Sequence, residues 1–337
     1  MARSGVIYGG SGSYKTSQIK YLARYIARKT GKCTLLLSND GGGWEPCRPE
    51  IDAGMIRPYR VEASVLPLIL LRKISQGYWP DNPEETDPAR INLIPINYDE
   101  VGGLAWEGWT SAGVCISRFL ADKGISVGGE DRTKGNMMFT LPVHAMGQVV
   151  TEAFGSTTRG DYKFIQNQLN GLVMQFNSLP LEYVLYTALE SKTEDDDRTT
   201  IYGPAIEGKK GTAQCGAWVG DMIHAQDYQV PRVVKVPNPA GGDPIDQTVF
   251  DVIVRYFFKK HPDPATGILF PAKTRVTPEK VGELEKRFPG GYFEPKHTGE
   301  QAFDSYLEAM DELAREVGQE DSLKGWRERA DQKLGRK

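Results

Sequence analysis

The chain has 337 residues, of which 39% are hydrophobic and 25% are charged, and its formal net charge is −3. This composition is typical of an ordinary soluble globular protein. The slightly acidic balance excludes a general electrostatic attraction to nucleic acid, so any DNA contact has to come from a local basic patch.

The cysteines and the apolar runs bear on the cellular compartment. The four cysteines include no Cys-x-x-Cys pair, so we expect free thiols in a reducing cytoplasm, with neither a disulfide framework nor a zinc site. We find no apolar signal segment and no apolar run that approaches membrane-spanning length, so we expect no membrane contact.

The first predicted elements enclose a glycine-rich loop. Residues 5–8 are a short apolar run suited to a buried strand, and residues 16–29 carry apolar positions at helical spacing before a glycine stop. Between them the sequence reads Gly9-Gly10-Ser11-Gly12-Ser13-Tyr14-Lys15-Thr16.

This loop is one position short of a phosphate-binding P-loop, which reads Gly, four residues, then Gly-Lys-Ser/Thr. Tyr14 stands where the second defining glycine is expected. We interpret residues 9–16 as a nucleotide-binding loop, in which Lys15 reaches the β- and γ-phosphates and the Thr16 hydroxyl ligates Mg²⁺. The alternative is a Gly/Ser-rich turn before an amphipathic helix, and Tyr14 leaves the rate of turnover open.

The next elements alternate between strand and helix, which favours a mostly parallel sheet covered on both faces. The predicted segments are a strand at 33–38, a helix at 65–74, a surface loop at 80–90, a strand at 91–98 and a helix at 103–122.

Two acidic positions follow predicted strands. The strand at 91–98 ends in Asp99-Glu100, which is typical of a Walker B motif: Asp99 would hold Mg²⁺ through water and Glu100 could polarise the attacking water. Asp40 ends the strand at 33–38, at the sheet edge expected for the phosphate loop. The sequence leaves open whether Asp40 or Glu100 is the catalytic base, and Asp99-Glu100 could also be a plain acidic turn.

The middle of the chain adds an insertion and a fourth strand. Residues 123–160 are rich in Gly and Thr and lack a clean period, so we expect an inserted segment there. A helix is expected at 161–179 and a strand at 181–188. Thr187 and Glu190, near the end of that strand, could sense the γ-phosphate or could only cap the strand.

Lys209 and Lys210 stand in a Gly-flanked loop within residues 199–228, between two short strands. They could reach a phosphate on a neighbouring subunit, as an arginine finger does, or contact a DNA backbone. Most exposed lysine pairs do neither.

The pattern changes near residue 229, which suggests two parts joined by a linker. We expect an α/β core at 1–228 with its sheet flanked by helices, a Pro/Gly-rich linker at 229–246, and a small α+β extension at 247–337. The extension carries a strand at 249–257, a helix opened by Thr277-Pro278, and a last amphipathic helix opened by a capping box at 298–301.

Several groups of residues, taken in chain order, carry a resemblance. They are residues 9–16, Ser38-Asn39-Asp40-Gly41-Gly42, Asp99-Glu100, Tyr186-Thr187-Ala188-Leu189-Glu190, Tyr202-Gly203-Pro204-Ala205 with Gly208-Lys209, and the tail segments 259–267, 272–275 and 289–293.

In this order the motifs resemble the phage-encoded RecA-like P-loop ATPases that act as nucleotide-binding or single-strand-annealing recombination proteins. The resemblance implies a RecA-like core, Mg²⁺ and ATP as cofactors, weak hydrolysis, and action on single-stranded DNA beside phage recombination or replication proteins in the host cytoplasm. It also implies a homo-oligomeric ring or filament. By position, Lys15, Thr16 and Asp99 match phosphate and metal contacts, Asp40 a catalytic carboxylate, and Lys209 a lysine acting on the next subunit, together with Lys210.

Two functions from different classes follow. The first is a DNA-dependent ATPase, for which single-strand binding needs basic groups and stacking aromatics such as Trp106 and Trp109. The second is a nucleotide-gated assembly module with little or no hydrolysis. A packaging or unwinding motor ranks below both, because no helicase-like series of motifs is present.

Overall fold

The structure is a computed structural model, and it describes most of the chain. The described residues are 2–38, 44–60, 68–82, 85, 90–109, 159–194, 200–206, 209–237, 239, 243–264, 266–295 and 302–315. Asp40 and nearly all of the insertion expected at 123–160 lie outside them. Among the described residues, no helix combines the length and apolar character that a bilayer crossing needs.

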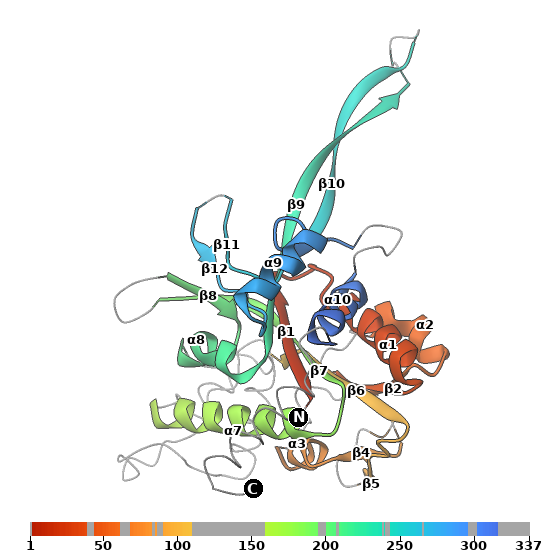
Figure 1. Ribbon diagram of the computed structural model, residues 1–337, viewed down its shortest axis with the longest axis vertical. Helices are drawn as coiled ribbons and strands as arrows, with labels where there is room; N and C mark the ends of the chain where they lie inside the picture. Colours follow the sequence, from red (N-terminus) through yellow and green to blue (C-terminus); the bar gives the residue numbers. More distant parts are fainter. Residues whose placement is uncertain are drawn as a thin grey trace, which may run out of the picture.

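A nine-stranded sheet runs through the middle of the molecule (Figure 1). Six of its strands are mutually parallel, in the order β9-β1-β7-β6-β2-β3, and antiparallel β10, β13 and β8 extend it. The bounds are β1 Arg3–Gly9, β2 Cys33–Ser38, β3 Ile56–Arg60, β6 Val101–Glu107, β7 Tyr183–Glu194, β8 Thr200–Pro204, β9 Asp221–Val236, β10 Ile245–Phe257 and β13 Tyr292–Phe293.

Helices cover both faces of this sheet (Figure 1). Because side chains alternate along a strand, Val6 and Tyr8 of β1 join one buried cluster and Ile7 joins the other. The first cluster includes residues of α3 (Leu68–Ser75), α7 (Arg159–Ser178) and α8 (Lys209–Trp218), and the second includes residues of α1 (Ser17–Thr30), α9 (Pro278–Arg287) and α10 (Phe303–Arg315). The expected α/β class with a mostly parallel sheet is therefore confirmed.

Most elements that were predicted from clean apolar patterns are present. The strand at 33–38 matches β2, the strand expected at 181–188 overlaps β7 from Tyr183 on, and residues 249–257 fall in β10. Helix α1 ends at Gly31, whose φ of 71° is the left-handed conformation that glycine adopts readily. The smaller elements are η1 Glu45–Cys47, α2 Arg48–Asp52, β4 Tyr78–Pro80, β5 Leu93–Pro95, β11 His261–Pro262 and β12 Leu269–Phe270.

Two predictions around residue 100 are wrong. The strand expected at 91–98 is only β5, which pairs with β4 in a separate two-stranded sheet. The helix expected at 103–122 begins instead as strand β6, which is buried along its whole length. Gly102 and Gly103 let β6 lie under α1, because a Cβ at Gly103 would come within 3.1 Å of Ile26; residues 110–122 lie outside the described part.

The linker expected at 229–246 is also wrong. Residues 229–236 continue β9 and pair in register with residues 245–252 of β10, and Pro231 sits opposite Phe250 within the ladder. Figure 1 shows these distal halves of β9 and β10 as a long two-stranded ribbon that stands clear of the other elements. We call residues 229–236 and 245–252 the arm.

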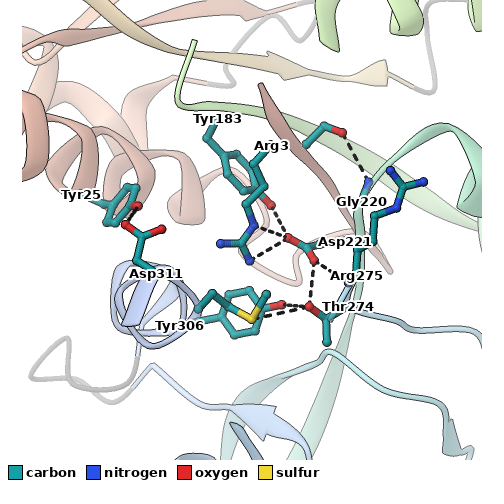
Figure 2. A network of polar contacts seen from close by, with 11 residues as sticks. Arg3, Tyr25, Tyr183, Gly220, Asp221, Thr274, Arg275, Tyr306 and Asp311 are labelled. Carbon is teal, nitrogen blue, oxygen red and sulfur yellow. Dashed lines mark hydrogen bonds and ion pairs between the residues drawn. The ribbon is translucent and has the colours of Figure 1, made fainter. Parts of the chain in front are cut away.

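A buried polar network closes the amino edge of the sheet (Figure 2). Asp221, at the start of β9, accepts hydrogen bonds from Arg3 Nε and from the Tyr183 hydroxyl, both at 3.1 Å. Its other oxygen accepts from the Thr274 hydroxyl at 2.9 Å, and Tyr306 of α10 donates to Thr274 at 3.0 Å. This amino-edge network ties the C-terminal segment to the first residues of three parallel strands.

Candidate functional site

The glycine-rich loop lies at the carboxyl edge of the sheet, between β1 and α1. The chain leaves β1 for α1 on one face, and it leaves β7 through the antiparallel strand β8 for α8 on the other, so neighbouring strands β1 and β7 diverge at this edge. Such a divergence is where open α/β sheets bind ligands. Gly9 ends β1 against β9, where a Cβ would lie 2.3 Å from the Ala225 carbonyl oxygen, so only glycine fits there.

The backbone conformation at position 14 is the one expected where the P-loop pattern has a glycine. Gly12 has φ +81° and Tyr14 has φ +49°, and Tyr14 is the one non-glycine residue with positive φ among the described residues. A left-handed conformation costs a non-glycine residue roughly 1–2 kcal/mol. Position 14 therefore has the conformation that favours glycine, while the Tyr14 ring is 62% exposed and points away from the core.

The hydroxyl group of Tyr256, on β10, contacts the backbone of this loop. Its buried hydroxyl lies 3.1 Å from the Ser13 carbonyl and 3.2 Å from the Tyr14 carbonyl, and it accepts a hydrogen bond from Gln18 Nε2 at 3.0 Å. Burial raises the pKa of Tyr256 well above its ordinary value, so the hydroxyl keeps its proton and can donate. The part of β10 that follows the arm thus contacts the strained part of the loop directly.

Lys15 curls back over the loop. Its ammonium donates to the carbonyls of Gly10 at 2.6 Å and Gly9 at 3.2 Å, and to Ser13 Oγ at 3.1 Å. Burial lowers the pKa of Lys15 to about 8, although nearby Asp227, Glu190 and Glu107 oppose that shift. A cation in this position is poised to exchange backbone carbonyls for a stronger anionic partner.

A second carboxylate meets the loop from β6. Glu107, the last residue of β6, accepts hydrogen bonds from the Thr16 hydroxyl and, at 2.7 Å, from the Ser38 hydroxyl at the end of β2. Glu107 is only 3% exposed. Two hydroxyls and one carboxylate are the hard oxygen ligands that Mg²⁺ prefers, so these residues fit a magnesium ion beside the phosphate loop.

Asp99 and Glu100 do not reach this site, contrary to the prediction. They form the turn before β6, at the amino edge of the sheet, because β6 begins only at Val101. Seven residues of strand, about 20 Å, separate them from its carboxyl end. Glu100 instead pairs with Arg57 at 2.8 Å on the surface, which lowers the pKa of Glu100.

A chain of three ionisable groups runs inward from the same carboxyl edge. Glu190 of β7 contacts His224 Nε2 at 2.7 Å, and His224 Nδ1 lies 2.9 Å from His261 Nε2. Both imidazoles are buried, and Phe257 stacks on His261 with ring centroids 3.5 Å apart. Burial, together with His224, lowers the pKa of His261 to about 4, so His261 stays neutral near pH 7.

The other predicted residues have varied placements. Thr187 is buried in β7, and its Oγ1 accepts a hydrogen bond from the Gly108 N–H at 3.3 Å, directly after Glu107. Lys209 and Lys210 belong to the first turn of α8, where the sequence predicted a loop. Asp40 lies outside the described residues, so its proposed part in catalysis stays a prediction.

Cys47 of η1 lies directly behind the loop. Its buried thiol is 3.6 Å from the Thr16 carbonyl oxygen, and burial raises its pKa to about 12. Cys33 and Cys215 are likewise buried and free, as expected, and Cys115 lies outside the described residues. In the described part of the chain no group of three or more His, Cys, Asp or Glu side chains gathers as a metal site.

Comparison with known proteins adds no family to these observations. No protein-family model matches the chain, and no curated protein matches it significantly.

Sequence reasoning missed three of the residues that build this site. Glu107 follows an apolar run that ends Leu104-Ala105-Trp106, a usable strand signal that the double glycine obscured. His224 reaches the site through the pairing of β9 with β1, and Tyr256 through the pairing of β10 with β9. No local pattern marks either pairing.

Proposed function

We propose that this chain binds ATP with Mg²⁺ at the loop of residues 9–16 and hydrolyses it, on a RecA-like P-loop core. The observation that carries the proposal is the meeting of Thr16, Ser38 and Glu107 beside Lys15 at the carboxyl edge of a parallel sheet. Backbone N–H groups at the start of α1 and the Lys15 ammonium supply the positive charge that a triphosphate needs.

In this proposal each residue has a stated task. Lys15 leaves the Gly9 and Gly10 carbonyls and binds the β- and γ-phosphates, while Thr16 and Glu107 hold Mg²⁺, directly or through water. The bound metal would neutralise charge on the phosphates. Thr187, which is hydrogen-bonded to the residue after Glu107, is a candidate to report on the γ-phosphate.

Glu190 is the described carboxylate best suited to polarise the attacking water. It follows Leu189, which pairs in register with Gly9, and its charge is felt by Lys15. His224 fixes one of its oxygens, and His261 fixes His224. Glu190 thus replaces Glu100 as a proposed base, and Asp40 is kept as the alternative.

Single-stranded DNA remains the proposed activator, with phage recombination or replication as the setting. The stacking aromatics expected for it need revision, because Trp106 and Trp109 are 0% and 1% exposed and cannot receive a base. A nucleotide-gated assembly module with little hydrolysis is the second candidate. The left-handed Tyr14 favours it, because this residue stores strain at the loop that has to close on phosphate.

The test measures ATP affinity and steady-state hydrolysis, with and without Mg²⁺ and single-stranded DNA. We expect Lys15→Ala to weaken ATP binding more than about 100-fold, because it removes the cation that contacts two phosphates. Glu107→Gln should retain binding and lower kcat by about 100-fold or more. Glu100→Gln is the matched control and should behave as the wild type.

Different outcomes distinguish the ATPase from the nucleotide-gated assembly module. Failure of the wild type to bind ATP, or full binding by Lys15→Ala, would contradict the proposal. Tight binding without turnover, with or without DNA, would support the assembly module. Turnover that Glu190→Gln leaves intact, while Glu107→Gln loses it, would remove Glu190 as the base and leave the nucleotide site standing.

A further inference from the structure

Two buried histidines lie behind the carboxylate that we propose as the base. His224 Nε2 lies 2.7 Å from Glu190 Oε2, and His224 Nδ1 lies 2.9 Å from His261 Nε2. The Glu190 side chain is 26% exposed, whereas His224 and His261 are 1% and 5% exposed. These three side chains, which we call the histidine row, therefore run from the rim of the carboxyl edge into the core.

The two imidazoles come from different elements and are held by aromatic rings. His224 belongs to β9, which pairs with β1, and His261 is the first residue of β11, which pairs with β12 in a hairpin. Phe257 stacks on His261 with ring centroids 3.5 Å apart, and Phe270 of β12 stacks on His224 at 4.0 Å. These stacks fix the ring planes, so the hairpin presents His261 Nε2 to His224 in one orientation.

The hydrogen-bond partners determine which nitrogen of each ring carries the proton. An ionised carboxylate only accepts hydrogen bonds, so an ionised Glu190 requires the proton of His224 on Nε2. A neutral His224 then offers Nδ1 as an acceptor, and this requires the proton of His261 on Nε2. With Glu190 ionised, both histidines are therefore neutral and in the Nε2–H form, and both donate toward the carboxylate.

The inner end of the histidine row favours this order over its reverse. If Glu190 were protonated and donated to His224, or if His224 were charged, His224 Nδ1 would donate to His261 Nε2. His261 would then carry its proton on Nδ1, which is buried and has no hydrogen-bond partner among the described residues. The Pro262 backbone favours a proton on His261, but it is not aligned to accept a hydrogen bond from Nδ1. A bare ring nitrogen is tolerated there better than a buried N–H without an acceptor.

The ionisable groups around the histidine row agree with this order. The charge of Glu190 acts on Lys15, an attraction that only the ionised carboxylate gives. Tyr8 packs on His224 with ring centroids 4.8 Å apart, and burial, together with Glu190, raises the pKa of Tyr8, so its hydroxyl stays neutral. Asp263 favours a cation at His261, but burial and His224 outweigh it and lower the pKa of His261 to about 4.

We propose that His224 and His261 are positioning residues which, each in its Nε2–H form, hold the Glu190 carboxylate ionised and oriented at the phosphate loop. The use of Glu190 as the base rests on the proposed function. Because His224 occupies Oε2 of Glu190, a proton taken from the attacking water goes to Oε1. The hairpin of β11 and β12 supplies the inner histidine, so residues beyond 228 are part of the ATPase site.

The first experiment detects the ring protons directly and needs no nucleotide. Long-range ¹⁵N–¹H NMR of the full chain, labelled with ¹⁵N-histidine, shows which ring nitrogen carries the proton. The chain has four histidines, so a His261→Gln variant and a His224→Gln variant assign the two signals. We expect the Nε2–H form at both residues between about pH 5 and about pH 8. An Nδ1–H form or a cation at either residue at neutral pH would overturn the proposal.

The second experiment separates the hydrogen bond from the packing. His261→Phe keeps a ring against Phe257 but removes the N–H, whereas the amide of His261→Gln can still donate to His224. We expect His261→Phe to lower kcat about 10- to 30-fold, with KM for ATP within about twofold of the wild type. It should also raise the pH of half-maximal kcat on the acid side by about 1, because a protonated Glu190 is no longer disfavoured. His261→Gln should keep kcat within about threefold and the acid side unchanged.

The outcomes keep this proposal apart from the proposed function. Equal activity of His261→Phe and His261→Gln, when circular dichroism melts show that both fold, would reduce His261 to a packing residue and contradict the proposal. Turnover that survives Glu190→Gln would contradict it too, and the nucleotide site would stand. A wild type that binds no ATP contradicts the proposed function, and the nucleotide-free NMR result then decides alone whether the two histidines hold Glu190 ionised.

Discussion

The two edges of the parallel sheet both carry buried polar clusters, but the clusters are built differently. At the amino edge, every part of the Asp221 carboxylate is held by a protein donor, and Gly5 leaves room for nothing more, since a Cβ there would lie 2.3 Å from the Tyr183 hydroxyl. At the carboxyl edge, Lys15 rests on backbone carbonyls and Tyr14 is strained.

This contrast distinguishes a structural polar cluster from a functional one. A cluster whose donors and acceptors are matched by charge has no partner left to gain, and it stabilises the fold. A cluster that leaves a cation on neutral carbonyls, beside a strained loop at a strand divergence, can gain from a ligand. If this comparison holds, substitutions at the amino edge change stability alone, and those at the carboxyl edge that touch the loop also change ligand affinity.

The largest effect is expected at the amino edge. Asp221→Asn should lower the free energy of unfolding by about 3 kcal/mol, because Arg3 then keeps a buried charge without its counter-charge. Urea unfolding measures this loss, and ATP affinity of the folded variant should match the wild type. A large loss of affinity at constant stability would contradict this distinction between the two edges.

The next effect depends on pH and belongs to the carboxyl edge. The pKa of His261 is about 4 in the folded protein and about 6.5 in an unfolded chain. Between these values the unfolded state binds the extra proton, so stability falls as pH drops from about 6.5 to about 4, by about 2–3 kcal/mol. His261→Gln should lack this component when urea midpoints at pH 7 and pH 4.5 are compared; equal losses in both proteins would contradict it.

Tyr256→Phe should have a smaller, mixed effect. It removes the hydroxyl that contacts the Ser13 and Tyr14 carbonyls and Gln18, so we expect a loss of about 1–2 kcal/mol in stability. ATP should bind about 3- to 10-fold more weakly, because the loop is no longer fixed. Tyr228→Phe, on the neighbouring strand and away from the loop, is the control; equal effects of both variants would detach Tyr256 from the loop.

The smallest effect is expected at Tyr14. Tyr14→Gly relieves the left-handed strain but frees the unfolded chain, so stability should rise by less than about 1 kcal/mol. Tyr14→Ala keeps the strain and removes only the ring. If titration calorimetry finds tighter ATP binding for Gly than for Ala, the backbone limits affinity; equal binding would show that the strain is irrelevant.

Local patterns predicted much of the fold. Helix α1, strand β2 and helix α9 follow from apolar spacing and end signals that their own residues carry. Strand β6 could not be predicted in the same way, because Gly102 and Gly103 weaken its apolar run, and their cause is packing under Ile26. The prolines of the arm predict a linker, yet a two-stranded ribbon with free edges tolerates proline.

The site was predictable only where the chain is contiguous. Residues 9–16 alone predict a phosphate loop, but Glu107, the acid that accepts a hydrogen bond from Thr16, is 91 positions away. Asp99 and Glu100 matched the expected motif, and their strand begins after them instead of before. Once β6 is assigned, Glu107 is the acid at its carboxyl end. The wrong prediction for residues 103–122 therefore caused the wrong choice of Asp99 and Glu100 as site residues.

The rate at which the Cys47 thiol is alkylated reports how fast the loop segment opens. Thiol reagents attack the thiolate, and this thiol is buried against the Thr16 carbonyl with a raised pKa, so it reacts only when the segment opens. Residue-resolved mass spectrometry of alkylated protein would read that opening rate without any introduced probe. Cys33 and Cys215, both buried in the first core cluster, supply internal standards for global unfolding. A ligand seated on residues 9–16 should slow the modification of Cys47 more than that of either standard.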